Sequence, residues 1–142
     1  MKSDFRKLLR GILFILIFVG FNARICAQQR WLEQSGFGLM FHYEAFKNHN
    51  SESYNQTIDS FDVPRFVAAI ESTKANHIIF VVGQHWGKYC APNSVYEKLL
   101  GVENGVWTSK RDLIMEIGQE LAKRDIKLIL YMTARAPMRH YK

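Results

Sequence analysis

Three short apolar runs divide the chain, and polar side chains follow each of them. The runs are FGLMFH at 37–42, IIFVV at 78–82 and IKLILYM at 126–132. Near-continuous apolar runs of this length, rich in β-branched and aromatic residues, are typical of strands that are covered on both faces in a parallel sheet. We therefore expect three parallel strands, the second of them ending at Gly83.

Helical periodicity predicts two helices between these strands. Asp62 can cap the first, Pro64 is tolerated in its first turn, and its apolar face is expected at Phe66, Val67, Ala69 and Ile70. The second is expected over 110–124, capped by Thr108 or Ser109, with an apolar stripe made of Leu113, Ile114, Ile117, Leu121 and Ala122. The stretches 43–60 and 86–110 show no period, so we expect long loops there.

The order of these elements predicts the fold class. Strand, helix, strand, helix, strand with apolar strands is typical of an α/β protein with a parallel β-α-β-α-β arrangement and right-handed crossovers. Two helices cannot cover both faces of three apolar strands. The pattern therefore resembles the first part of a larger α/β protein.

The N-terminus has the form of a secretory signal. Basic residues precede the apolar run 11–21, and small residues follow at 25–27. A run of this length is shorter than the about 20 residues that cross a bilayer as a helix. We expect a signal peptide over 1–27, cleavage after Ala27 and a secreted or periplasmic protein that meets the membrane only through this signal. An uncleaved anchor is the alternative, and a lipoprotein at Cys26 ranks below it.

Charge and cysteine content narrow the function classes. The first 27 residues carry +4 of the net charge of +6, so too little remains in 28–142 for a nucleic-acid-binding surface. After cleavage Cys90 is the only cysteine, which excludes an internal disulfide. We expect Cys90 to be packed rather than reactive.

Amide, imidazole and indole side chains gather where the first two strands end. They are His42 after the first strand and Gln84, His85 and Trp86 after the second. Ligands bind at the carboxyl ends of the strands in open α/β sheets and in barrels, so we expect a pocket there. Neighbouring residues on an extended segment point to opposite faces, which argues against a metal site, and no cofactor is expected. Alternatives are histidines buried in the core and a tryptophan packed on its own strand.

Several motifs occur in one order and register. They are WLEQSGFGLMFH at 31–42, Phe61-Asp62, GQHWG at 83–87, SKRD at 109–112 and LILY at 128–131. With these motifs, the segment from Trp31 to about Ala136 resembles the N-terminal part of the catalytic domain of α-L-fucosidases of glycoside hydrolase family 29. The resemblance implies that 28–142 holds the first three strands of a TIM (β/α)₈ barrel, which is incomplete in this chain.

The resemblance also implies an activity and a substrate. The expected reaction is retaining hydrolysis of terminal α-L-fucosyl or related glycosidic bonds, in which two carboxyl groups about 5–5.5 Å apart take part. His42 and His85 would bind sugar hydroxyls beside Gln84 and Trp86.

The catalytic carboxyl groups of the family fall outside the resemblance. The family's nucleophile follows the fourth strand and its acid/base lies further on, whereas no Asp or Glu follows the third strand here. We therefore expect the nucleophile and the acid/base at positions beyond Lys142. No catalytic residue is expected in this chain, and no hydrolysis by it alone.

Three departures from the family pattern keep other functions open. Tyr43-Glu44 stands where the family has Trp-Gly, Gln84 replaces the first histidine of a pair, and Trp86 replaces the aspartate after that pair. The alternative is a non-catalytic secreted carbohydrate-binding protein or a decayed fragment. A complete three-stranded module is a third possibility, and it would be soluble and unfold cooperatively.

Overall fold

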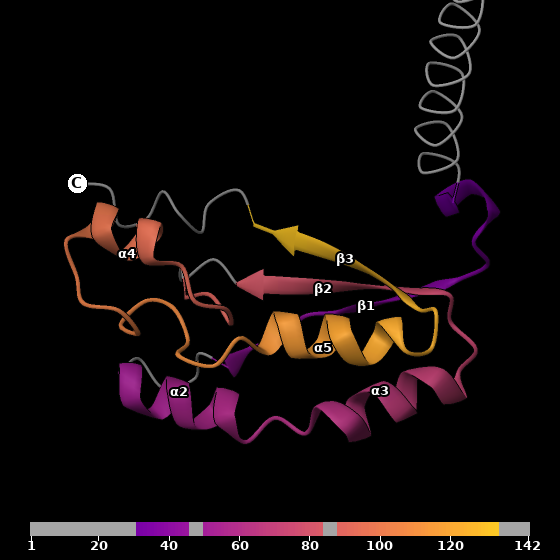
Figure 1. The fold of residues 1–142 in the computed structure, drawn as a ribbon, viewed down its shortest axis with the longest axis horizontal. Coiled ribbons are helices and arrows are strands. Elements are labelled where there is room, and N and C mark those ends of the chain that lie inside the picture. The colour runs from indigo at the N-terminus through magenta and orange to yellow at the C-terminus, as the bar shows by residue number, and fades with distance from the viewer. Residues whose placement is uncertain (1–30, 46–49, 84–87, 134–142) are drawn as a thin grey trace, which may run out of the picture. The chain divides into compact units, whose positions relative to one another are not determined.

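The computed structural model describes residues 31–45, 50–83 and 88–133 (Figure 1). The chain divides into two units at Ser35, and residues 31–34 in the first unit form one helical turn. The second unit holds all the strands and helices described below. The expected signal peptide, 1–27, lies outside the described residues and stays a prediction.

Three parallel strands form the sheet, in the order β1-β2-β3. They are β1 (Gly38–Phe41), β2 (His77–Gly83) and β3 (Lys127–Met132). Phe41 pairs with Phe80, which in turn pairs with Leu130, and the register shifts between Val81 and Gly83 at the end of β2. The predicted parallel β-α-β-α-β arrangement is confirmed, and the sheet is not closed.

The two predicted crossover helices are present, and aspartate side chains cap both. They are α3 (Val63–Ser72) and α5 (Leu113–Ala122). Asp62 Oδ1 accepts a hydrogen bond from the Arg65 N–H at 2.9 Å, as expected. The cap of α5 is Asp112, which accepts from the Met115 N–H at 2.9 Å. The prediction of Thr108 or Ser109 as the cap is wrong because both residues are buried before the helix begins.

Two further helices replace parts of the expected loops. They are α2 (Ser51–Asp59) and α4 (Ser94–Leu100), which are capped by Asn50 and Asn93. The left-handed residue Gly101, with a φ of 67°, ends α4. The prediction of structureless loops over 43–60 and 86–110 is therefore wrong in part, because Asn and Gly residues that are common in loops serve here as helix caps.

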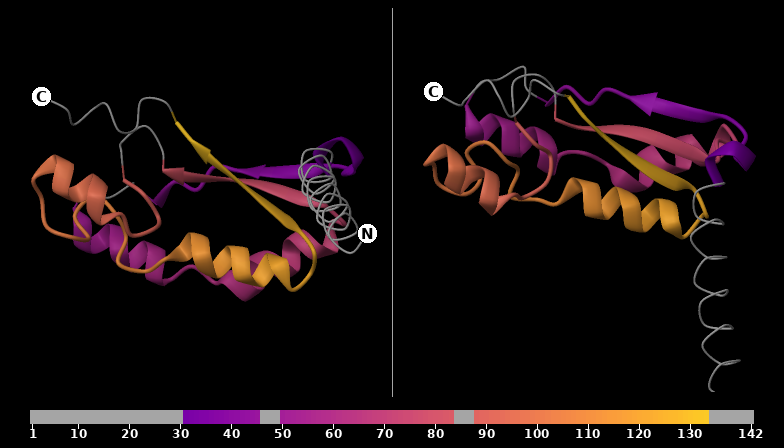
Figure 2. Two further views of the ribbon diagram at one scale, coloured as in Figure 1. Left: turned by 45° about the horizontal axis from the view of Figure 1, so that its top comes forward. Right: turned by 90° about the horizontal axis from the view of Figure 1, so that it is seen from above.

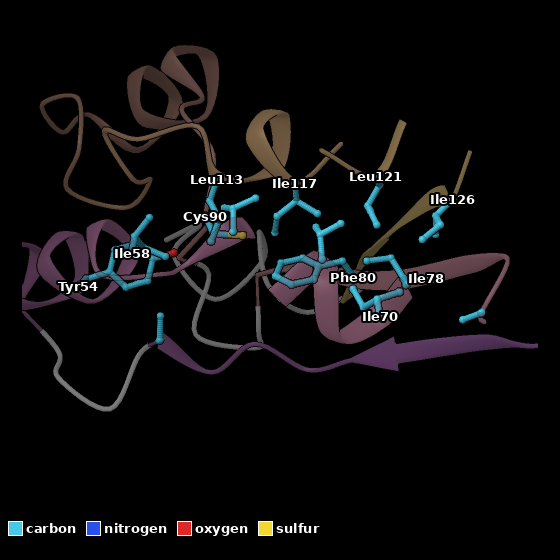
Figure 3. Packing of buried hydrophobic residues seen from close by; sticks show 14 residues of the cluster. Tyr54, Ile58, Ile70, Ile78, Phe80, Cys90, Leu113, Ile117, Leu121 and Ile126 are labelled. Atoms are coloured by element: carbon cyan, nitrogen blue, oxygen red, sulfur yellow. The ribbon is translucent and has the colours of Figure 1, made fainter. Parts of the chain in front are cut away.

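The core lies between the sheet and the pair α3 and α5, which lie side by side on one face (Figures 1 and 2). Its buried side chains come from β2, α2, α3 and α5, together with Cys90, and Figure 3 shows how they pack. Phe80 is the largest of the fully buried side chains. The expected stripes hold for Val67, Ile70, Leu113, Ile117 and Leu121, whereas Ala69 and Ala122 are exposed.

The other face of the sheet has no helix over it in the described part of the chain (Figure 2). Leu39 and Phe41 pack against the core, so Met40 between them points to this helix-free face, and it is 47% exposed. Tyr131 of β3 points to the same face, because its neighbour Leu130 pairs with the core residue Phe80, and it is exposed as well. The expected uncovered apolar strand surface is therefore present.

Arg111 joins α2 to the start of α5. Its Nη1 donates to the carbonyl oxygens of Ile58, Asp59 and Phe61 at 2.8–3.1 Å, where α2 ends. Its Nε and Nη2 bind both carboxylate oxygens of Glu116 in a forked pair. This pair raises the pKa of Arg111 and lowers that of Glu116.

We expect Arg111→Lys to lower the free energy of unfolding by about 1–2 kcal/mol, because an ammonium cannot reproduce the planar fork. The midpoint of urea unfolding, followed by pulse proteolysis at low protein concentration, measures this loss. Arg65→Lys, on the exposed side of α3, is the matched control and should leave the midpoint unchanged. Equal midpoints for both variants would contradict the role given to Arg111.

Candidate functional site

His42 directly follows β1, and its neighbours determine the face on which it lies. The Phe41 ring packs edge-to-face on Phe66 at 4.8 Å between centroids, and the Tyr43 ring does so on Phe61 at 5.0 Å. Both rings thus face the helices, so the exposed His42 side chain lies on the helix-free face. This is the carboxyl end of the sheet, where the sequence predicts the pocket.

Tyr43 stands where the family pattern has tryptophan, and its role here is structural. Its ring lies 6.0 Å from that of Phe80, and its hydroxyl donates to the Thr57 carbonyl of α2 at 3.3 Å. Burial raises the pKa of this phenol. The residue at this position is therefore an aromatic side chain that packs against the core.

Tyr131 of β3 points to the same face of the sheet as His42. Phe41, the last paired residue of β1, pairs with the core residue Phe80, and Tyr131 pairs with Val81, one position further along β2. By alternation Val81 and Tyr131 face away from the helices, and Val81 is fully buried whereas Tyr131 is 42% exposed. Tyr131 is therefore an accessible side chain near the carboxyl end of the sheet.

The end of β2 is held by the residues that return to it. An added Cβ at Gly83 would lie 2.4 Å from both the Lys88 carbonyl oxygen and the Tyr89 ring, so only glycine allows this close approach. The Cys90 N–H donates to the Val82 carbonyl at 2.9 Å. Gly83 and Lys88 therefore lie against each other at the carboxyl end of the strand.

Several of the expected site residues are not tested by the structure. Gln84, His85 and Trp86 lie outside the described residues, and their predicted roles stay predictions. Lys142 and the residues before it, from 134 onward, lie outside the described residues too. The expectation of a nucleophile and an acid/base beyond Lys142 likewise stays a prediction.

Lys88 is a buried cation that the sequence analysis missed. Its Nζ lies 5.1 Å from the centre of the Tyr54 ring and 5.7 Å from that of Trp107. Aromatic faces attract a desolvated ammonium group, while burial lowers its pKa. This contact joins α2, the segment that follows β2 and the segment before α5.

Cys90 and Asn55 are buried, and both have structural roles. Burial raises the pKa of the Cys90 thiol to about 12, which confirms the packed interpretation. Asn55, in the sequon Asn55-Gln56-Thr57, donates to the carbonyls of Ser51 and Gly105 and accepts from the Lys110 N–H at 2.8 Å. A glycan on this buried amide is incompatible with the folded chain.

Residues 31–45, 50–83 and 88–133 contain no group of three His, Cys, Asp or Glu side chains that could hold a metal ion. Within these same ranges, no helix is long and apolar enough to cross a bilayer.

No family model matches the chain, and no curated protein matches it either. Among solved structures, the α-L-fucosidase AlfC from Lactobacillus casei, in complex with α-L-fucose product, is similar with a TM-score of 0.52. It is 15% identical over 72% of this chain and 40% of that one. The fold is similar to part of an α-L-fucosidase fold.

Two other structures give the same result. The fucosyltransferase mutant of AlfC has a TM-score of 0.52 at 15% identity, over 72% of this chain and 39% of that chain. The α-L-fucosidase from Vibrio sp. strain EJY3 has a TM-score of 0.52 at 17% identity, over 75% of this chain and 22% of that chain. The chain thus spans between about a fifth and two fifths of the length of these fucosidases. At such identities the likeness establishes the fold, which agrees with the fold that the sequence motifs imply.

Proposed function

We propose that this chain is the leading part of a fucosidase-like glycoside hydrolase barrel and that it binds a sugar at the carboxyl end of its strands. The observation that carries the proposal is that His42 and Tyr131 are both exposed on the helix-free face, near the carboxyl end of the sheet. In a closed barrel this face is the interior, and the carboxyl ends of its strands surround the active site.

The two described side chains suit a pyranose. An imidazole both donates and accepts hydrogen bonds, as a sugar hydroxyl does, and a tyrosine adds an aromatic face and a hydroxyl group. Gln84, His85 and Trp86 belong to the same proposal through the sequence resemblance. The α-L-fucose product named in the AlfC structure makes fucose the first sugar to test.

The proposed role of the 142 residues is binding, without hydrolysis by this chain alone. A retaining glycosidase uses two carboxyl groups, and Glu44 is the one acidic residue close after the first strand. Measurable release of an aryl group from an aryl α-L-fucoside by the purified chain would contradict this role.

A non-catalytic secreted sugar-binding protein is the second candidate. The replacements at Gln84 and Trp86 favour it, because they alter the family pattern where the second strand ends. Export through the N-terminal signal is part of both proposals.

We expect His42→Ala to weaken binding of methyl α-L-fucoside about three- to tenfold, because one or two hydrogen bonds to a neutral hydroxyl are lost. Isothermal titration of the full chain measures the affinity. Lys74→Ala is the control, since Lys74 is exposed in the turn before β2, at the other end of that strand. Unchanged affinity in His42→Ala, with the wild type binding the sugar, would overturn the assignment of His42.

A further inference from the structure

A cavity lies in the connection between β2 and α5. It has a volume of about 360 Å³ and is formed by the start of α4 and the segment 104–110. In Figure 1 this connection lies beyond the carboxyl end of β2. Its volume is at the lower end of the range of about 300–1,000 Å³ found for small-molecule sites, which suits a ligand the size of one monosaccharide.

Glu97 is the buried wall of this cavity. It is only 1% exposed, and its Oε1 accepts three backbone N–H groups, from Gly105 at 2.8 Å and from Trp107 and Thr108 at 3.0 Å. No described residue donates a hydrogen bond to its Oε2. The side chain is therefore fixed through one oxygen and keeps the acceptor capacity of the other.

Other lining residues carry hydrogen-bond donors. Lys110, which has an ammonium group, and Asn93 and Asn104, which have amides, line the cavity together with Glu97. One carboxylate and one ammonium group leave the lining without net charge, which disfavours both a free cation and a free anion. Acceptors and donors in one lining suit a neutral ligand that offers both, as the hydroxyl groups of a sugar do.

We propose that this cavity is a second sugar subsite, which takes one neutral pyranose of the glycan. Glu97 Oε2 accepts a hydrogen bond from one sugar hydroxyl, and the Lys110 ammonium donates to another. The inference rests on the proposed sugar-binding function, and it adds residues that lie on neither β1 nor β3. It also gives Glu97 a role besides holding the segment 105–108.

Nuclear magnetic resonance of the full chain tests the subsite. During titration with methyl α-L-fucoside and with methyl β-D-galactoside, we expect saturable shifts of the Gly105, Trp107 and Thr108 amides with at least one sugar. Lys110→Met should weaken the affinity read from these amides about fivefold or more. Lys98→Met is the control, because this exposed residue of α4 does not line the cavity, and it should leave the affinity unchanged.

Glu97→Gln separates the two roles of this side chain. An amide keeps one oxygen for the three N–H groups and places a donor where Oε2 accepts, so we expect about tenfold weaker binding without loss of the fold. His42→Ala should leave the shifts at 105–108 in place while reducing those at the Tyr43 amide.

Each pattern of shifts bears differently on the subsite and on the proposed function. Shifts near His42 without shifts at 105–108 would overturn the subsite and support the proposed function. Shifts at 105–108 alone would support the subsite and overturn the His42 pocket. The absence of saturable shifts at both places would overturn both proposals, and equal affinities in Lys110→Met and Lys98→Met would overturn the subsite.

Discussion

Phe80→Ala is expected to lower the free energy of unfolding by about 3–5 kcal/mol, enough to unfold most of a marginally stable chain. Phe80 is 1% exposed, and its ring meets those of Tyr43, Phe61 and Phe66 at centroid separations of 5.9–6.5 Å. Truncation leaves a cavity at the junction of β2 and α3, and it also removes the edge-to-face contacts with Phe61 and Phe66.

Pulse proteolysis across a series of urea concentrations measures the midpoint of unfolding of this variant. Phe37→Ala is a matched control that removes the same atoms from a residue that is 52% exposed, and we expect a change below about 0.5 kcal/mol there. Equal losses in the two variants would show that the aromatic cluster is not the centre of the core.

Glu97→Leu is expected to lower the free energy of unfolding by about 3–5 kcal/mol, through a different mechanism. Leucine fills much of the same space, but it leaves the N–H groups of Gly105, Trp107 and Thr108 buried without an acceptor. Trp107 would lose its position beside Lys88, so its fluorescence should change with the loss of stability.

Glu103→Leu is the control for Glu97→Leu. Glu103 is exposed in the same connection, and it does not line the cavity that Glu97 lines. We expect Glu103→Leu to lower the free energy of unfolding by less than about 0.5 kcal/mol. If Glu97→Leu proved as stable as Glu103→Leu, the carboxylate would not be what orders the segment 105–108.

The strands could be predicted closely from the sequence, because apolar runs with β-branched residues leave few alternatives. The helices α2 and α4 could not, since α2 is mostly polar and α4 is only seven residues long. Tyr54 and Ile58 have helical spacing, and Asn50 precedes them as a cap, which is the signal that could have identified α2. Asn93 and Gly101 carry the corresponding signal for α4.

The candidate site could be predicted only where it depends on the alternation of side chains along a strand. His42 follows a short apolar strand, and the side to which it points is determined by the packing of Phe41 and Tyr43. Whether Tyr131 is covered depends on where the helices lie, which the strand sequence does not contain. The role of Glu97 depends on hydrogen bonds from backbone N–H groups 8 to 11 residues further along the chain, and no sequence motif predicts such bonds.

The order β1-β2-β3 leaves one long side of β1 and one of β3 without a partner strand in the described sheet. Each presents a row of backbone donors and acceptors beside exposed Met40 or Met132, and such a row is a template for another extended chain. Self-association of this protein should therefore grow by backbone pairing, and a short peptide with strand-forming sequence should compete with it.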